Sequence, residues 1–287
     1  MVILKAILLG VIQGLTEFIP ISSSAHLVIV PWLLTWDDPV LESLTFDVAL
    51  HLGTLVALLA FFAKDWVRLI RAGVLSIVER KVGTDLDRRM AWFLVIGSIP
   101  GGVIGLLFES KIEEWFHPAE GPIPGSSMIA MALIMAALGA LLFLAERLAA
   151  HTRRFNQLGI RDSILIGTAQ ALAIFPGVSR SGSTITAGLA LGLERESAAR
   201  FSFLLSAPIV AGAGLKSLLH IFKEIQSGAL TGGELAVFPV GFLAAAISGY
   251  FCIKFLLRYL QTHPTTAFVI YRWLLAVLVL AIVLSRA

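Results

Sequence analysis

Charged residues are scarce in this sequence. Only 14% of the 287 residues are Asp, Glu, Lys or Arg, whereas soluble domains carry about 25%. Hydrophobic residues make up 57%, and the mean hydropathy is +0.89. Too little polar material remains to cover a surface that faces water. The composition therefore excludes a soluble domain or a disordered chain and predicts an all-α polytopic membrane protein.

Cysteine is nearly absent too. Cys252 is the single cysteine of the sequence, which excludes an intrachain disulfide and a thiolate metal site. The net charge of +3 comes without a basic run interleaved with aromatics, so nucleic acid is not an expected partner. The apolar stretch 1–21 imitates a signal peptide, but Glu17 and Pro20 interrupt it, and we expect it to be retained.

Six apolar stretches are long enough to cross a bilayer as helices. They cover residues 46–63, 91–108, 128–145, 201–219, 237–256 and 267–285. Two further apolar stretches, 1–36 and 163–193, are broken by proline, glycine and polar residues. Broken backbone at membrane depth must be buried in protein or line a polar cavity. We therefore expect six transmembrane helices and two re-entrant helix–loop–helix hairpins, forming a single membrane domain over residues 1–287.

The two broken stretches resemble each other at a constant offset of 157 residues. Gly10, Gln13, Leu15, Phe18, Ser22 and Ser24 match Gly167, Gln170, Leu172, Phe175, Ser179 and Ser181. We read this as an internal repeat, about 1–145 and 160–287, in which each copy is one hairpin followed by three spans. An odd number of crossings inverts the second copy, and inverted repeats bring their breaks together near the membrane midplane.

Lys and Arg gather in two predicted loops, 64–90 and 146–162, which we expect to be cytoplasmic. Both termini and the first hairpin then face outside. Arg272 lies near a span end and is expected to snorkel toward the interface.

Other features allow weaker expectations. Asp47 and His51 share a helix face; we expect helix-end solvation, with a second polar shell around the site as the alternative. Small residues in 128–145 and 237–253 could pack against another copy in a homodimer.

Ionisable groups inside membrane segments are functional candidates. In the first hairpin these are Glu17 and His26, and Gln13 shares a helix face with Glu17. A buried carboxylate needs a partner, so Glu17 and Gln13 are candidates to hold Mg²⁺ or Ca²⁺. The structural alternatives are that Gln13 and Glu17 join helices, and that His26 is a buried hydrogen-bonding histidine. At least one of the three serines 22–24 is expected to be a helix N-cap.

The second hairpin contains the run 176–184, Pro-Gly-Val-Ser-Arg-Ser-Gly-Ser-Thr. Its glycines permit close backbone approach, and a helix that starts there points its N–H groups into the break. Arg180 adds a charged fork suited to phosphate, although it could instead form a buried ion pair with Glu17. Together the hairpins indicate phosphoryl chemistry on a membrane-embedded substrate.

At these residues the chain resembles the undecaprenyl-diphosphate phosphatase family, the integral-membrane type also called bacitracin-resistance protein. One family motif is Glu/Gln-x-x-x-Glu, here residues 13–17, and the other is Pro-Gly-x-Ser-Arg-Ser-Gly, here 176–182. The resemblance implies hydrolysis of undecaprenyl diphosphate to undecaprenyl phosphate, which recycles the lipid carrier for peptidoglycan synthesis and confers bacitracin resistance. It also implies a divalent cation, the bacterial inner membrane and a site that opens to the periplasmic side.

The resemblance also assigns roles by position. Catalysis falls to Glu17, Ser23, His26 and Arg180, and the metal to Glu17 and Gln13. Substrate binding falls to Ser22, Ser179, Arg180, Ser181, Gly182 and Thr184. The nucleophile stays open between Ser23, His26 and a metal-bound water, with a slight preference for a His26-centred mechanism. A secondary transporter or lipid flippase is the main rival, since inverted repeats are also transporter architecture, and a structural scaffold is the third hypothesis.

Overall fold

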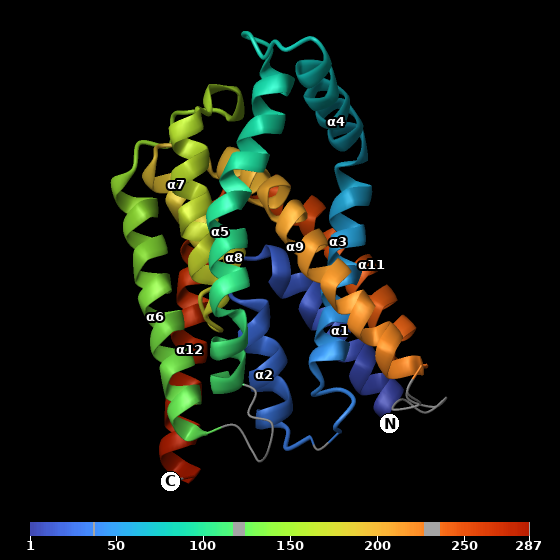
Figure 1. The fold of residues 1–287 in the computed structure, drawn as a ribbon. Coiled ribbons are helices and arrows are strands. Elements are labelled where there is room, and N and C mark those ends of the chain that lie inside the picture. Colours follow the sequence, from blue (N-terminus) through green and yellow to red (C-terminus); the bar gives the residue numbers. More distant parts are fainter. Residues whose placement is uncertain (37, 117–123, 227–235, 287) are drawn as a thin grey trace.

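The computed structural model describes residues 1–36, 38–116, 124–226 and 236–286, which form helices and no β-strand (Figure 1). The first half comprises α1 Val2–Phe18, α2 Ser23–Leu33, α3 Leu44–Phe61, α4 Ala63–Val78, α5 Leu86–Phe116 and α6 Gly125–Leu148. The second half comprises α7 Ile160–Ala171, α8 Arg180–Ala190, α9 Arg195–Gln226, α11 Val237–Leu260 and α12 Thr266–Arg286. Short 3₁₀ turns lie at Phe155–Gln157 and Leu172–Ile174.

The helices confirm a polytopic membrane protein. Among the described residues, α5, α6, α9, α11 and α12 are long and apolar enough to span a bilayer, and the bent pair of α3 and α4 raises the number from five to six. Each of the six predicted spans falls on one of these helices. The prediction of a loop over 64–90 is wrong for most of its length, because α4 occupies 63–78. Apolar residues at helical spacing between its basic residues stabilise a helix there.

Both broken stretches are helix–break–helix in the structure. The second helix of each, α2 or α8, begins after a serine in the left-handed region, Ser22 at φ 77° and Ser179 at φ 66°. Each serine Oγ accepts the backbone N–H three residues later, from Ala25 or Gly182, as an N-cap does. Left-handed backbone costs a non-glycine residue about 1–3 kcal/mol. The expected N-cap is thus Ser22, and its match in the second half has the same conformation.

The two hairpins enter the bundle from opposite ends (Figure 1). α1 packs against α11, and α7 packs against α5. Glycines allow both approaches: a Cβ on Gly10 would lie 2.5 Å from the Gly241 carbonyl oxygen, and one on Gly167 would lie 2.0 Å from that of Gly97. The repeated glycine at offset 157 therefore marks the place where each hairpin meets a helix of the other half.

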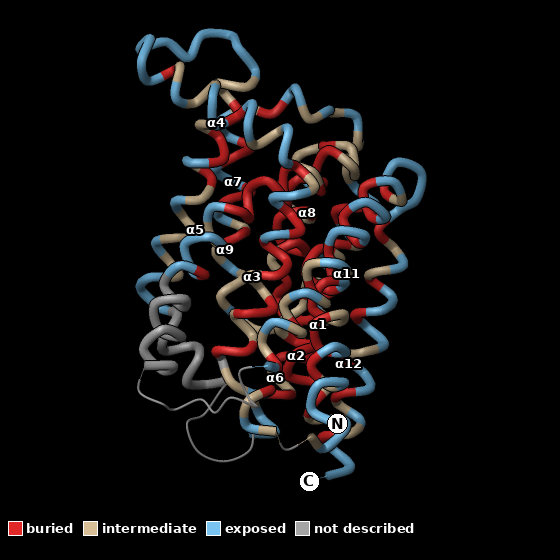
Figure 2. Tube along the Cα trace, turned by 90° about the vertical axis from the view of Figure 1, so that its right-hand side faces the viewer, coloured by how far each residue is buried: buried red, intermediate tan, exposed pale blue. Residues whose placement is uncertain are grey.

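Buried residues run through the centre of the bundle around the two breaks (Figure 2). Phe18 at the first break packs edge-to-face on Phe203 of α9, with ring centroids 5.3 Å apart. Small residues of the proposed dimer stripes pack within the chain, since Gly249 faces Phe18 and Gly139 faces Trp273. These two glycines are therefore used within the chain, and a homodimer through the remaining small residues of the two spans stays a prediction.

An ion pair closes the start of the second hairpin. Arg153 Nη2 and Nη1 donate to the two Asp162 carboxylate oxygens at 2.6 and 3.0 Å, and the Gly159 N–H donates at 2.8 Å. Burial opposes the ionisation of Asp162, but these hydrogen bonds outweigh it and hold the pKa of the carboxyl below its usual range. The pair ties the 149–159 connection to the first turn of α7.

Candidate active site

Glu17 lies one residue before the end of α1, where the two breaks meet, and is 6% exposed. Its Oε1 accepts a hydrogen bond from Arg180 Nη2 at 2.6 Å. Its Oε2 accepts from Ser23 Oγ at 2.6 Å and from Gln13 Nε2 at 3.0 Å. One carboxylate therefore joins α1, α2 and α8, and four residues chosen from the sequence are brought together around it.

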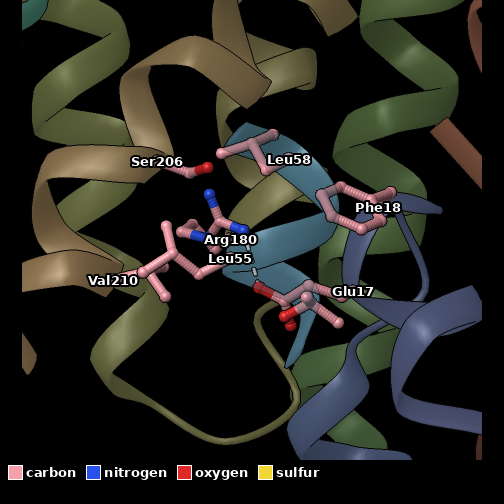
Figure 3. A pocket seen from close by; sticks show the side chains of 8 residues that line it. Glu17, Phe18, Leu55, Leu58, Arg180, Ser206 and Val210 are labelled. Carbon is pink, nitrogen blue, oxygen red and sulfur yellow. Dashed lines mark hydrogen bonds and ion pairs between the residues drawn. The ribbon is translucent and has the colours of Figure 1, made fainter. Parts of the chain in front are cut away.

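Arg180, the first residue of α8, has a second donor edge that is not used by Glu17. Its Nη1 is buried and has no hydrogen-bond partner among the described residues. Figure 3 shows the guanidinium between Glu17 and Ser206. The surrounding cavity is lined by Glu17, Phe18, Thr54, Leu55, Leu58, Arg180, Ser206 and Val210. A buried charged donor requires an acceptor, so this cavity has the chemistry of an anion site.

His51 of α3 lies beside the same carboxylate. Its Nε2 is 3.7 Å from Glu17 Oε2, and its Nδ1 donates to the Asp47 carbonyl at 2.7 Å. We expected Asp47 and His51 to be solvated at a helix end. The structure brings His51 into the polar shell around Glu17, which was the alternative that the sequence allowed for this helix face.

The hydroxyls at the start of α8 contact protein groups. Ser181 Oγ donates to the Ile19 carbonyl of the first break at 3.2 Å and lies 3.3 Å from Ser179 Oγ. Thr184 Oγ1 donates to the Arg180 carbonyl at 2.7 Å and contacts Ser202 of α9 at 2.6 Å. These contacts connect the breaks and α9, whereas only Arg180 of this segment lines the cavity. Substrate binding by the hydroxyls stays a prediction.

His26 is buried, and its hydrogen bonds go to neither Ser23 nor Glu17. Its Nδ1 donates to the Ser22 carbonyl at 2.6 Å, which leaves Nε2 facing Tyr271 Oη at 2.7 Å. The two rings stack with centroids 5.6 Å apart. Sequence reasoning missed Tyr271, because nothing local marks a tyrosine near the start of a span as a partner for His26.

Arg272 also lies elsewhere than the sequence predicted. Expected to snorkel, it is fully buried, with Nη1 donating to the Pro20 carbonyl at 3.2 Å and Nη2 donating to the Gly177 carbonyl at 2.9 Å. Broken helices leave carbonyls without partners, and one guanidinium supplies donors to both breaks. Gly182 makes room for it, since a Cβ there would lie 2.9 Å from Arg272 Nη1.

A metal ion would find few protein ligands here. No group of three or more His, Cys, Asp or Glu in the described part of the chain could hold one. Gln13 Oε1, however, is buried and without a partner among those residues, while Gln13 Nε2 donates to Glu17 Oε2, whose carboxylate also accepts from Ser23 and Arg180. Two oxygen donors fit Mg²⁺, which usually keeps waters and shares substrate phosphates rather than filling its shell from protein.

Known proteins resemble this chain over nearly its whole length. A family described as "Bacitracin resistance protein BacA" matches residues 6–278. A protein of Thermomicrobium roseum named undecaprenyl-diphosphatase is 44% identical over 279 residues, which is 97% of each chain. Another of that name, from Moorella thermoacetica, is 46% identical over 282 residues and 98% of each chain. A third, from Caldicellulosiruptor bescii, is 41% identical over 283 residues, covering 99% of this chain and 98% of its own.

Proposed function

The chain belongs to the bacitracin resistance protein BacA family, and from this premise we propose that it is a membrane phosphatase. It hydrolyses undecaprenyl diphosphate to undecaprenyl phosphate and inorganic phosphate, the reaction that its relatives' name describes. The product is the lipid carrier of peptidoglycan synthesis, and its recycling connects this activity to bacitracin resistance.

The observation that supports this reaction most is the Arg180 guanidinium, shared between Glu17 and a cavity. Nη2 is paired at 2.6 Å while Nη1 has no partner in the described part of the chain. The cavity measures about 10 Å³, room for about one water, so a terminal phosphate reaches Nη1 only as the guanidinium moves away from Glu17. The carboxylate then loses part of its counter-charge and becomes a stronger base.

Ser23 is the nucleophile that these contacts favour. Its Oγ already donates to Glu17 Oε2 at 2.6 Å, the geometry of a nucleophile with its base. Ser23 Oγ attacks the terminal phosphorus, its proton passes to Glu17, and the bond to the bridging oxygen breaks to release undecaprenyl phosphate. Water then hydrolyses the phosphoserine and restores Ser23. The proposal differs from the His26-centred mechanism with Ser23 close by that was preferred from the sequence, because the hydrogen bond to Glu17 is made by Ser23.

His26 can protonate the leaving group only as an imidazolium whose Nε2 exchanges the Tyr271 hydroxyl for the bridging oxygen. It follows Ser23 by three residues on α2, so the two side chains share a helix face. The Ser22 carbonyl holds the Nδ1 proton, and Tyr271 faces Nε2. Glu17 and Gln13 Oε1 would hold a divalent cation, and such an ion supplies charge neutralisation for the diphosphate.

We also propose that the two hairpins are re-entrant and the two halves inverted. The matched left-handed serines, the matched glycine contacts and the opposite entry of the hairpins support this. The two segments rich in Lys and Arg, 64–90 and 146–162, lie at the end of the bundle opposite the N-terminus (Figure 1). With these on the cytoplasmic side, the first hairpin opens to the outer side of the bacterial inner membrane.

Phosphate release from a long-chain prenyl diphosphate by purified protein in detergent tests the reaction. We expect release with Mg²⁺ or Ca²⁺ present, and its loss in Glu17→Ala with the thermal unfolding temperature retained. No release with either cation would overturn the phosphatase and favour the transporter. Loss of stability alone would favour a scaffold.

A further inference from the structure

Helix α4 differs from the spanning helices in direction. It leaves α3 at 80° after a break at Phe62. α3 has 18 residues, which at 1.5 Å per residue reach about 27 Å, close to the hydrocarbon core of about 30 Å. α3 can therefore cross without α4, and α4 turns far from the direction in which α3 crosses.

One face of α4 is attached to the bundle. Leu69 is buried in the main core. Ser76 Oγ accepts from Trp92 Nε1 of α5 at 2.9 Å, and Asp65 Oδ1 accepts from Arg200 Nη2 of α9 at 3.0 Å. These contacts fix the rotation of α4 about its axis and thereby determine which residues face outward.

The outward face is an apolar stripe. Five residues that are 54% to 74% exposed form it: Val67, Ile70, Val74, Ile77 and Val78. At 100° per residue they fall within a sector of about 100°, which is the width of an apolar helix face. The helix ends at Val78; Glu79, which pairs with Arg88, follows it, and Arg80 and Lys81 come next.

The edge beside this stripe is basic. Lys64 and Arg71 are exposed there, and neither forms an ion pair or side-chain hydrogen bond with any residue that the structure describes. Arg68, further round the helix, is paired with Asp65 and Asp87. Apolar residues next to unpaired basic residues are the pattern of a helix that lies in the headgroup region and attracts anionic lipid.

We propose that α4 is an interfacial helix on the cytoplasmic side of the membrane. Its apolar stripe lies among the upper acyl chain segments, and Lys64 and Arg71 bind anionic phospholipid headgroups. α4 thereby holds the ends of α3 and α5 at a fixed depth. This role does not depend on the phosphatase reaction.

The depth of α4 can be measured with a fluorophore on Val74→Cys in a Cys252→Ser background, reconstituted into vesicles of phosphatidylglycerol and phosphatidylcholine. Lipids carrying a nitroxide near the head of the acyl chain should quench it more than lipids carrying one near the chain middle. The reverse order is expected for Ile99→Cys, an exposed position on α5. Stronger quenching from the chain middle at Val74, or quenching by aqueous iodide alone, would overturn the interfacial placement.

The choice of lipid is tested at the same Val74 label. A nitroxide near the head of the acyl chain should quench the fluorophore at least about twofold more when phosphatidylglycerol carries it than when phosphatidylcholine does, because unpaired basic residues attract anionic lipid. We expect Lys64→Gln with Arg71→Gln to abolish this preference. The control pair, Arg147→Gln with Arg161→Gln, removes the same charge from exposed positions elsewhere and should preserve it. Headgroup binding by α4 would be contradicted if both pairs of substitutions reduced the phosphatidylglycerol preference equally. It would also be contradicted if neither pair reduced it.

Discussion

Arg180 and Glu17 are 163 residues apart in sequence, and their side chains meet at 2.6 Å across the junction of the two breaks. A buried pair can be purely structural. This one differs because the arginine has an unpaired Nη1 in a cavity, so the carboxylate positions a donor for a third group.

The second edge of Arg180 is tested by Arg180→Lys. Lysine keeps the charge beside Glu17 but cannot also offer a fixed second donor. We expect phosphate release to fall roughly 10- to 100-fold, as when one hydrogen bond to a charged group is lost, with the unfolding temperature near that of the wild type. Full activity in the lysine variant would show that Nη1 contacts no substrate.

Ser23 and Ser24 form a matched pair for identifying the nucleophile. Ser23 contacts Glu17, whereas Ser24 Oγ lies 3.3 Å from Ser22 Oγ. Ser23→Ala should lose activity by more than about 1,000-fold, and Ser24→Ala should stay within a few-fold. Rapid quench with labelled substrate should trap phosphate on Ser23. Activity retained in Ser23→Ala, with ¹⁸O from water entering phosphate in one turnover, would favour direct attack by water.

Tyr271→Phe removes the hydroxyl that faces His26 Nε2 and keeps the stacked ring. We expect kcat to fall about tenfold with KM nearly unchanged and the pH–rate profile displaced, because the protonation of His26 is perturbed. Tyr250→Phe is the control, since Tyr250 packs on Phe61. A profile identical to that of the wild type would limit Tyr271 to packing.

Gly167→Ala tests the close approach of α7 to α5. Its Cβ would lie 2.0 Å from the Gly97 carbonyl oxygen, and backbone cannot yield as a side chain does. We expect a loss of at least about 3 kcal/mol in unfolding free energy, measured by thermal melting. Gly105→Ala, with nothing within 4 Å, should be neutral or stabilise by up to about 1 kcal/mol. Equal losses of unfolding free energy in the two variants would contradict the close packing of α7 against α5.

The Arg153–Asp162 pair predicts a pH dependence. Because the folded-state pKa of Asp162 is lowered, its contribution is present above the ordinary Asp pKa of about 3.9 and is lost as the pH falls through the folded-state value. Asp162→Asn should lower the unfolding temperature by a few degrees at about pH 7, and the difference should narrow toward about pH 3. A constant difference would exclude ionisation as its cause.

Much of this architecture could be predicted because membrane segments carry a strong local signal. The six spans follow from apolar length, and the two breaks follow from Pro20 and Pro176 with their neighbouring serines. The Glu17–Arg180 pair was only the alternative to phosphate binding by Arg180, and the structure shows that it forms. Helix α4 was missed because its basic residues suggest a loop until their helical spacing is considered.

The roles of Arg272 and Tyr271 could not be predicted from the sequence, and for His51 the polar shell was only the alternative to helix-end solvation. Each lies in an ordinary apolar span, and its function depends on a partner in another helix. Arg272 has the residue type of an interfacial anchor, and only the position of the two breaks reveals the carbonyls that it satisfies. Such contacts are long-range, so no window of local sequence contains both partners.

The position of Arg272 on α12 also sets an order for biosynthesis. Both breaks leave the ribosome before α12 does, so the carbonyls of Pro20 and Gly177 wait for the donor that Arg272 provides. Insertion of α12 is therefore the event that completes the junction. A nascent chain in which only the earlier helices have been inserted can already form the Glu17–Arg180 pair and the Ser181–Ile19 contact, but it lacks the donors that Arg272 adds between the two loops.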